Sequence, residues 1–215
     1  MMKSVLIIGA GQFGTHIAKR MEELRCEVMA VDINEECINE IMPYVTNAKI
    51  GDGTNEEFLR TLGVNDYDVC FVTLGYHFQS SLETTSLLSE LGAKKVISRA
   101  TNDVQKKFLL RNGADEVVYP EKQTAFRIAT KYAYDNILDF FHLDNNYYIY
   151  ELKVPKGWYG KSLLQIDIRK KYKINILTIK RSSEVLIPSA NTVIQPNDVA
   201  FVLGELQDIQ KSFKL

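Results

Sequence analysis

The sequence predicts an α/β protein with a Rossmann-type doubly wound parallel sheet, a long helix and a small α+β subdomain. A glycine-rich turn, Gly9-Ala-Gly11-Gln-Phe-Gly14, joins the first apolar strand to the first helix. Strand and helix patterns alternate through the first 120 residues, and beyond Asp144 strands predominate. Near-continuous apolar strands separated by helices are typical of a parallel sheet that is covered on both faces.

Six strands and five helices are expected in the first part of the chain. The strands are expected at residues 5–8, 27–31, 48–50, 69–73, 95–99 and 116–119, and the helices near 14–24, 34–43, 58–62, 80–91 and 104–112. Asn34 can cap the second helix, and Pro43 ends it soon afterwards. Gly113 is suited to the left-handed conformation that ends the fifth helix.

A longer helix is expected over residues 121–141, and its apolar positions cover more than one narrow stripe. Either it returns to the core of its own domain or it crosses to a partner subunit, and its residues favour neither alternative. The remainder, residues 145–215, is expected to form a small α+β subdomain that differs from the first domain. Its strands are expected at 147–154, 174–180, 184–187 and 199–203, with a short helix capped by Ser162 and a last helix over 206–213. The predicted parts are therefore residues 1–120, 121–141 and 145–215.

Composition and charge exclude several classes of protein. The formal net charge is -1, which gives no electrostatic support for binding to nucleic acid or to anionic membranes. No apolar run approaches the roughly 20 residues of a spanning helix, and the start of the chain lacks signal-peptide features. The 3 cysteines have no metal-like spacing, so we expect reduced thiols in a soluble, cytoplasmic protein without direct membrane insertion.

The glycine turn carries a dinucleotide-binding signature. Gly9 permits the tight turn, Gly11 lets a pyrophosphate approach the backbone, and Gly14 lets the helix pack on the strand. Phosphates then bind free amides at the helix N-terminus. Asp32 ends the second strand, where a carboxylate accepts hydrogen bonds from an adenosine ribose and repels a 2′-phosphate. We expect binding of ATP, ADP, AMP or NAD(H), and the alternative is a Rossmann fold that has lost its ligand.

Other candidate residues lie where the predicted strands end. Asp52 follows the third strand, Thr73-Leu-Gly75 ends the fourth, and Arg99 ends the fifth and could meet a phosphate or form a surface ion pair. Glu121 could hold a divalent cation or simply begin the helix after Pro120. The expected nucleotide-contacting residues are Gly9, Gly11, Gln12, Phe13, Gly14, Asp32, Ile33, Asp52, Gly53, Thr73, Leu74, Gly75 and Arg99.

Catalytic machinery is not evident in the sequence. A dehydrogenase needs a substrate domain and a proton-transfer group near the nicotinamide, and the segment after Asp144 is small for the first role. The 3 histidines are scattered, and neither a nucleophile elbow nor a metal-binding cluster is present. We therefore expect a protein that senses a nucleotide, and an NAD-dependent oxidoreductase is the alternative.

Nine short segments together resemble one family. In the first part they are Ile7-Ile-Gly-Ala-Gly-Gln-Phe-Gly14, Ala30-Val-Asp-Ile-Asn-Glu-Glu36, Gly51-Asp-Gly-Thr54, Gly113-Ala-Asp115 and Pro120-Glu-Lys122. In the second part they are Glu151-Leu-Lys-Val-Pro155, Gly160-Lys-Ser-Leu163, Asp167-Ile-Arg169 and Pro196-Asn-Asp198. The chain thus resembles RCK (KTN) domain proteins along nearly its whole length, in particular the regulatory subunits of Ktr/Trk potassium uptake systems.

The resemblance implies homodimers that assemble into a ring, typically of eight subunits, docked in the cytoplasm beneath a membrane-embedded potassium-translocating subunit. ATP and ADP stabilise different ring shapes in Ktr-type members, and NAD(H) is the ligand of Trk-type members. The resemblance also implies that the long helix crosses to a partner subunit and that Glu121 is a candidate for a cation site between subunits. A regulator of a different ion channel or antiporter is the alternative within the family.

Two further features follow from the resemblance. Several Ktr-type members have an arginine after the second glycine of the turn, whereas this chain has Gln12, so discrimination of ATP from ADP by that route is weakened. Some relatives bind cyclic di-AMP in the C-terminal subdomain, and the alternative here is ordinary packing and dimerisation. The equivalent residues are Ile168, Arg169, Asn175, Ile176 and Pro188.

Overall fold

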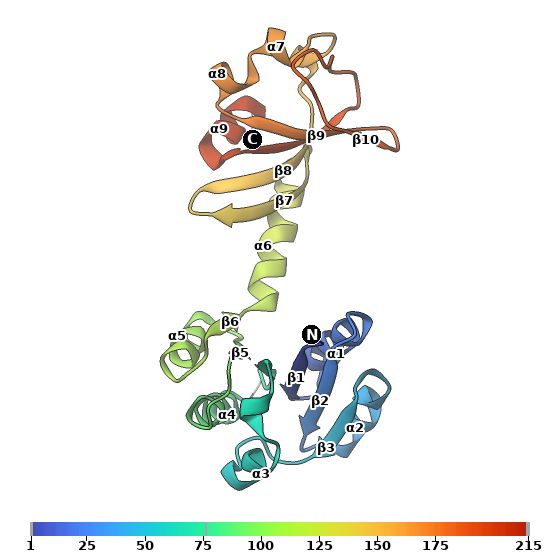
Figure 1. Cartoon of the computed structure of the whole chain (residues 1–215). Coiled ribbons are helices and arrows are strands. Elements are labelled where there is room, and N and C mark those ends of the chain that lie inside the picture. Colours follow the sequence, from blue (N-terminus) through green and yellow to red (C-terminus); the bar gives the residue numbers. More distant parts are fainter. Residues whose placement is uncertain (1, 76, 214–215) are drawn as a thin grey trace. The chain divides into compact units, whose positions relative to one another are not determined.

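The computed structural model describes residues 2–75 and 77–213. The chain divides into two compact units, an N-terminal unit of Met1–Lys122 and a C-terminal unit of Gln123–Leu215 (Figure 1). Among the described residues, no helix combines the length and the apolarity that crossing a membrane requires.

The N-terminal unit is built on a six-stranded parallel sheet, which confirms the predicted Rossmann-type architecture. Its strands are β1 Ser4–Ile8, β2 Glu27–Asp32, β3 Asn47–Ile50, β4 Val69–Val72, β5 Val96–Arg99 and β6 Glu116–Val118. The order across the sheet is β3-β2-β1-β4-β5-β6, and every pairing is parallel. The chain leaves the carboxyl ends of β1 and β4 in opposite directions, and ligands of open α/β sheets bind in the crevice at such a switch point.

Helices cover both faces of this sheet. They are α1 Gln12–Glu23, α2 Glu35–Ile41, α3 Glu56–Thr61, α4 Phe78–Glu90 and α5 Asp103–Arg111, with short 3-10 turns at Met42–Tyr44 and Val64–Asp66. Successive side chains of β1 point to opposite faces: Val5 and Ile7 join the core with α1 and α2, whereas Leu6 and Ile8 join the core with α3 and α4. Both cores are needed because a parallel sheet has no solvent-exposed face.

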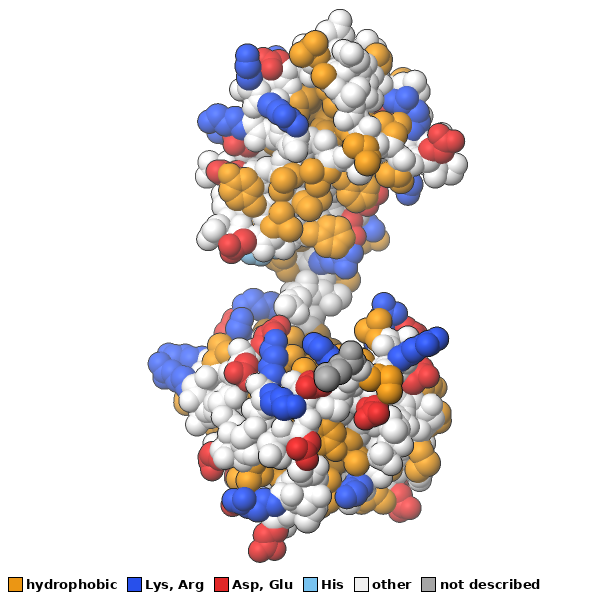
Figure 2. Space-filling view, viewed as in Figure 1, with side chains coloured by type: hydrophobic (Ala, Val, Ile, Leu, Met, Phe, Trp, Pro, Cys, Tyr) orange, Lys and Arg blue, Asp and Glu red, His pale blue; other side chains and the backbone are white. Residues whose placement is uncertain are grey.

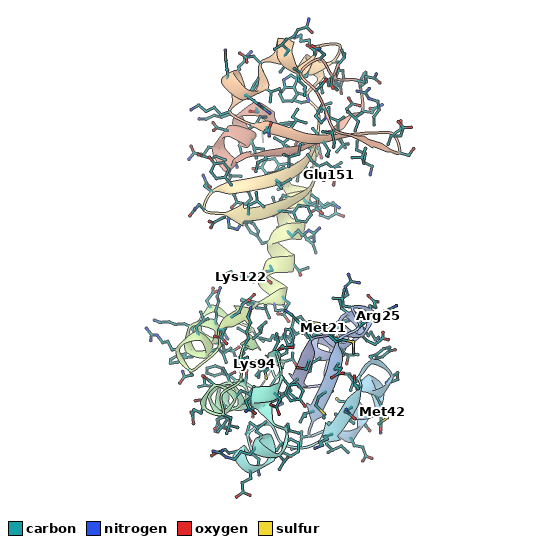
Figure 3. All side chains as sticks on the ribbon, in the orientation of Figure 1. Met21, Arg25, Met42, Lys94, Lys122 and Glu151 are labelled. Carbon is teal, nitrogen blue, oxygen red and sulfur yellow. The ribbon has the colours of Figure 1, made fainter. Side chains whose placement is uncertain are left out.

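Capping residues fix several helix ends as the sequence predicts. The Asn34 side chain accepts a hydrogen bond from the Glu36 amide at the start of α2. Gly113 has φ 102°, a left-handed conformation that suits glycine at the end of α5. After the last residue of α1, Arg25 adopts a left-handed conformation with φ 58° in the turn that leads into β2 (Figure 3).

The long helix differs from the prediction. Helix α6 spans Pro120–Ala133. Of the residues expected to continue it to position 141, 134–136 form a turn and 137–141 belong to the strand β7, Ile137–Asp144. Strand β7 pairs antiparallel with β8, Tyr147–Lys153, and buries Phe140 against Tyr150. The apolar spacing in this segment is compatible with a helix and with a strand, and pairing with β8 decides between them because it satisfies the backbone of both strands.

The C-terminal unit is a small α+β structure, as predicted. Its sheet has the order β10-β9-β11-β8-β7, in which β9 is Asn175–Arg181, β10 is Glu184–Leu186 and β11 is Val199–Glu205. The helices are α7 Leu163–Ile166, α8 Ile168–Tyr172 and α9 Leu206–Phe213, with a 3-10 turn at Lys156–Trp158. Ser162 caps α7 in a capping box with Gln165, as expected, whereas α8 was not predicted. Trp158 and Phe213 pack edge to face in the core, with ring centroids 5.1 Å apart.

Apolar side chains also remain exposed on the C-terminal unit. On the face seen in Figure 2 they gather over the region of β7 and β8. None of the residues of α6 is buried. The exposed large apolar residues of α6, β7 and β8 are Phe126, Ile128, Tyr132, Phe141, Leu143 and Tyr147. Exposed large apolar side chains that gather on one face are typical of a protein interface.

Candidate functional site

The glycine turn lies between the end of β1 and the start of α1. Gly9 has φ 106°, which favours glycine, and the Thr73 hydroxyl after β4 donates to the Ile8 carbonyl at 3.0 Å. A Cβ at Gly14 would collide with the Gly9 carbonyl oxygen, whereas a Cβ at Gly11 would meet no atom within 4 Å. Gly14 therefore permits close packing of helix on strand, and Gly11 leaves open space above the backbone.

Asp32 binds the same turn from the end of β2. Its carboxylate accepts from the Ala10 amide at 2.7 Å through Oδ2 and from the Asn34 amide at 2.8 Å through Oδ1. Each carboxylate oxygen retains capacity for a second hydrogen bond, so the group can still accept from ribose hydroxyls. The carboxylate thus holds the turn in place and lines the cleft at the carboxyl ends of the strands.

A cleft runs along the carboxyl ends of the strands, in two adjoining cavities of about 880 Å³ and 250 Å³. The cavities share Gly9, Asp32, Ile33, Leu74 and His77. The larger cavity is also lined by Gly11, Gln12, Phe13, Thr73, Gly75, Arg99 and Glu121, and the smaller by Asp52 and Gly53. Every predicted nucleotide-contacting residue except Gly14 therefore lines one cleft, and their role in binding stays a prediction.

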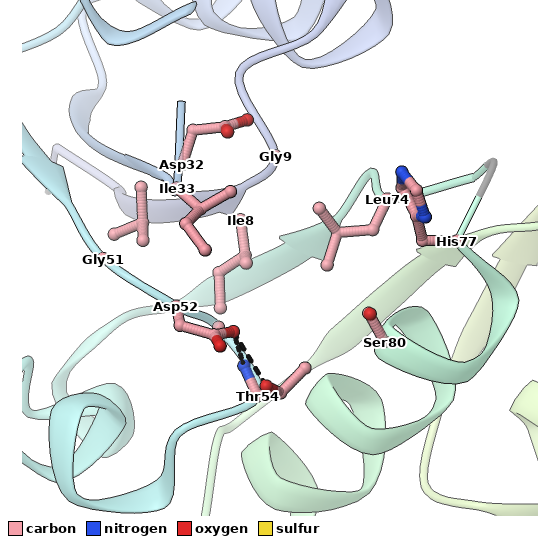
Figure 4. A pocket seen from close by; sticks show the side chains of 12 residues that line it. Ile8, Gly9, Asp32, Ile33, Gly51, Asp52, Thr54, Leu74, His77 and Ser80 are labelled. Atoms are coloured by element: carbon pink, nitrogen blue, oxygen red, sulfur yellow. Dashed lines mark hydrogen bonds between the residues drawn. The ribbon is translucent and has the colours of Figure 1, made fainter. Parts of the chain in front are cut away.

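The smaller cavity is closed on one side by the segment after β3 (Figure 4). Asp52 Oδ1 accepts from both the backbone amide and the hydroxyl of Thr54, at 2.8 Å each. Gly53 is buried, and a Cβ there would press on Ile8 and Thr84. The hydrogen bonds of Asp52 fix the shape of the loop, and the lack of a side chain at Gly53 lets the loop lie close to Ile8 at the end of β1.

Arg99 brings a positive charge to the larger cavity. Its guanidinium lies 5.4 Å from the centroid of the Phe13 ring and forms an ion pair with Glu121. Burial raises the pKa of Glu121, but a backbone hydrogen bond and the Arg99 ion pair outweigh burial and hold the pKa below its usual value. Both alternatives that the sequence left for Arg99, a phosphate contact or an ion pair, are compatible with this position.

The metal prediction for Glu121 stays a prediction. Among the described residues, no group of three or more His, Cys, Asp or Glu side chains gathers to hold a metal ion. Glu121 follows Pro120, the first residue of α6, and lies in the first turn of that helix, which agrees with the simpler alternative. The described residues of one chain therefore do not complete a cation site around this carboxylate.

Several cleft residues were absent from the predicted set. His16, Asn34, Cys37, His77 and Ser80 line one or both cavities. Burial, Asp32, Glu40 and Glu36 together raise the pKa of the Cys37 thiol, which remains free. All five follow the end of a strand, either just before the next helix or in its first turns, and this was the available signal. For those within helices, helix phase decides which side chains face the cleft.

A third cavity, of about 260 Å³, lies in the C-terminal unit between α7, α8 and the loop after β10. Arg169 donates from Nη2 to the Asn175 side-chain oxygen at 3.2 Å. Asp167, with φ 56°, also lines the cavity. All five residues predicted for a second effector line it, namely Ile168, Arg169, Asn175, Ile176 and Pro188. Their proximity is established, and a ligand for them stays a prediction.

Comparison with known proteins places the chain in a family. The TrkA-N domain matches residues 5–120 and the TrkA-C domain matches residues 148–215. The Ktr system potassium uptake protein C of Bacillus subtilis is 40% identical over 98% of this chain and 96% of its own. The Ktr system potassium uptake protein A of the same organism is 34% identical over 97% of this chain and 95% of its own.

A solved structure supports the fold independently. The GsuK channel bound to NAD has a TM-score of 0.66 and 17% identity, over 99% of this chain and 39% of that chain. This chain thus spans about two fifths of the channel chain, and the likeness concerns the fold alone. With both family domains in order and close identity to Ktr proteins along almost its whole length, the chain belongs to the TrkA-N/TrkA-C (RCK) family of Ktr/Trk potassium uptake regulatory subunits.

Proposed function

We propose that this chain is a cytoplasmic nucleotide-sensing subunit that gates a membrane-embedded potassium-translocating partner. The observation that carries this proposal is the single cleft at the switch point of β1 and β4, lined by the glycine turn and Asp32. The names of the Ktr relatives supply the transport role. They also favour regulation over the alternative of an NAD-dependent oxidoreductase.

The ligand is an adenine nucleotide (ATP, ADP or AMP) or NAD(H). These ligands share an adenosine ribose for Asp32 and phosphates for the amides at the start of α1, where no side chain caps the helix and the first turn has no acidic residue. The similarity in fold to an NAD-bound channel supports the dinucleotide alternative. Gln12 adds hydrogen-bonding groups to this end of the cleft without adding a charge.

The proposed mechanism is a population shift in a homodimer that assembles into a ring of eight subunits. A nucleotide that binds one ring geometry better than another favours that geometry by its differential affinity alone. Tenfold discrimination is about 1.4 kcal/mol per site, so several sites acting together are needed for an effective switch. The exposed apolar side chains of α6, β7 and β8 support an interface with a second copy.

Substitution of Asp32 by asparagine tests the nucleotide site. We expect nucleotide affinity to fall about 10-fold to 100-fold, since a hydrogen bond to a charged group contributes about 1.5–3 kcal/mol. Calorimetry with ATP, ADP, AMP, NAD and NADH measures the change, and circular dichroism verifies that the variant is folded. Glu35→Gln is the matched control, because Glu35 is exposed in the first turn of α2 and does not line the cleft.

Two results would contradict the assignment. Wild-type protein that binds none of these nucleotides would remove the sensing function, and unchanged affinity in Asp32→Asn would move the site elsewhere. The transport role is tested by deleting the gene that encodes this chain. We expect the deletion to impair potassium uptake by the cells at low external potassium. Expression of the wild-type chain should restore uptake, and expression of Asp32→Asn should not. Turnover of a hydroxy or amino substrate with a change in nicotinamide absorbance would favour the oxidoreductase alternative instead.

For the cavity of the C-terminal unit we propose cyclic di-AMP as a second effector. Arg169 supplies a cation, Asn175 supplies an amide, and Ile168, Ile176 and Pro188 form an apolar floor. We expect Arg169→Ala to weaken cyclic di-AMP binding about 10-fold or more, since a charge-assisted bond to phosphate is lost. Calorimetry against Lys170→Ala, an exposed neighbour on α8 that does not line the cavity, measures the effect. Equal losses in both variants would indicate a general charge effect.

A further inference from the structure

The side chain of Arg99 is fixed in the wall of the nucleotide cleft. Only 10% of it is exposed, and its guanidinium lies 5.4 Å from the centroid of the Phe13 ring. The Gly75 backbone also lies close to this side chain, since a Cβ at Gly75 would come within 3.2 Å of the guanidinium carbon. Because Phe13 belongs to the first turn of α1, this packing holds the positive charge beside the amides proposed to bind phosphate.

Glu121, which pairs with Arg99, is the more exposed member of the pair. Its side chain is 51% exposed and lies in the first turn of α6, the helix that leaves the N-terminal unit. A carboxylate in a first helical turn is stabilised by the helix dipole, so it can rest there without a cation. Breaking the ion pair therefore requires less free energy when Glu121 moves away than when Arg99 does.

The charges of the cleft make Arg99 the natural partner of a phosphate. Among the described residues lining the two cavities, Arg99 is the only lysine or arginine, whereas Asp32, Asp52 and Glu121 are acidic. A phosphate bound at the start of α1 adds negative charge beside Glu121 and competes with it for the same guanidinium. Both anions cannot be neutralised by a single guanidinium.

We propose that Arg99 exchanges Glu121 for the nucleotide phosphate, so that nucleotide binding releases the first turn of α6 from β5. This inference rests on the proposed nucleotide site and adds how occupancy reaches α6. The two equilibria are linked. The Arg99–Glu121 ion pair lowers the affinity for nucleotide, and bound nucleotide destabilises the ion pair by the same factor. A ligand with more negative charge on its phosphates should displace Glu121 from Arg99 more completely.

Neutralising Glu121 gives the decisive test. In Glu121→Gln the guanidinium loses its competing anion, so we expect affinity for ADP and ATP to rise about threefold to tenfold, and affinity for NAD to rise less. Calorimetry on the full chain measures these affinities, and EDTA in the buffer removes divalent cations that would otherwise contribute to binding. Arg99→Gln should lower the affinity, and in that background Glu121→Gln should no longer raise it, as a double-mutant cycle measures.

Asp103→Asn is the matched control. Asp103 forms an exposed ion pair with Lys122, at 2.7 Å, next to the same end of α6 (Figure 3), and it does not line the cleft. The substitution removes one negative charge from the same unit and breaks an ion pair to α6 without touching the cleft. We expect it to change nucleotide affinity by less than about twofold, since exposed pairs are screened by salt.

The outcomes separate the exchange from the proposed function. If wild type binds nucleotide and Glu121→Gln leaves or lowers its affinity, the exchange is wrong and the nucleotide site stands. A rise of equal size in Asp103→Asn, or a rise that persists in the Arg99→Gln background, also overturns the exchange. If wild type binds no nucleotide, the proposed function and the exchange fail together.

Discussion

Replacement of Gly14 by alanine is expected to lower the free energy of unfolding of the N-terminal unit by about 3 kcal/mol, at the upper end for overpacking. The added Cβ would collide with the Gly9 carbonyl oxygen, which is backbone and cannot rotate away as a side chain can. The helix α1 would have to move from β1, and the turn between them would lose its shape. Hydrogen exchange of the β1 and β4 amides measures the loss of stability in this unit.

Gly11→Ala is the matched variant, with the opposite expectation. Gly11 has φ -66°, which alanine adopts without strain, and its Cβ would meet nothing within 4 Å. We expect stability to be unchanged within about 0.5 kcal/mol while nucleotide affinity falls, because the methyl group occupies space proposed for the phosphates. Equal stability of the two variants would contradict the packing role of Gly14. Full nucleotide affinity in Gly11→Ala would contradict the phosphate position.

Asp198→Asn is expected to lower the free energy of unfolding of the C-terminal unit by about 2–4 kcal/mol. Asp198 is 1% exposed and accepts from Arg181 Nε, Arg181 Nη2 and the Gln195 amide, each at 2.8 Å. An asparagine cannot accept all three bonds, and it leaves the arginine charge without its counter-ion at a largely buried position. The single tryptophan, Trp158, lies in the same core, so its fluorescence reports unfolding of this unit.

The same pair predicts an acid-sensitive C-terminal unit. Burial raises the pKa of Asp198, but the Arg181 and Gln195 hydrogen bonds outweigh it and hold the pKa below its usual value. A lowered pKa in the folded state stabilises the protein above the unfolded value of about 3.9, and this contribution is lost as pH falls through the folded pKa. The difference in stability between wild type and Asp198→Asn should therefore be constant above about pH 5 and shrink below it.

Asp135→Asn is the control for both measurements. Asp135 is exposed in the same unit, so its removal should leave stability and its pH dependence nearly unchanged. A similar loss in Asp135→Asn would indicate a general charge effect. A pH-independent difference for Asp198→Asn down to acid unfolding would contradict the assigned carboxylate.

The predicted Rossmann-type unit rests on strong local signals. The glycine turn, the apolar strands and the caps at Asn34 and Gly113 each specify one conformation, and they agree with one another. The cleft residues at strand ends were predictable because the carboxyl ends of parallel strands meet at one edge. Those on helices, such as His16 and Cys37, were not, since small changes in helix phase decide which side chains line a cavity.

The sequence by itself determined the fold class, the order of elements, the position of the glycine turn with Asp32, and the resemblance to RCK proteins. Only the tertiary structure decided that the helix stops at Ala133 and that β7 begins at Ile137, because the strand partner that satisfies the β7 backbone follows later in the chain. It alone brought Arg99 from β5 onto Glu121 and Phe13, and Arg181 onto Asp198. Pairs so far apart in sequence depend on how distant segments pack, which no local pattern of residues encodes.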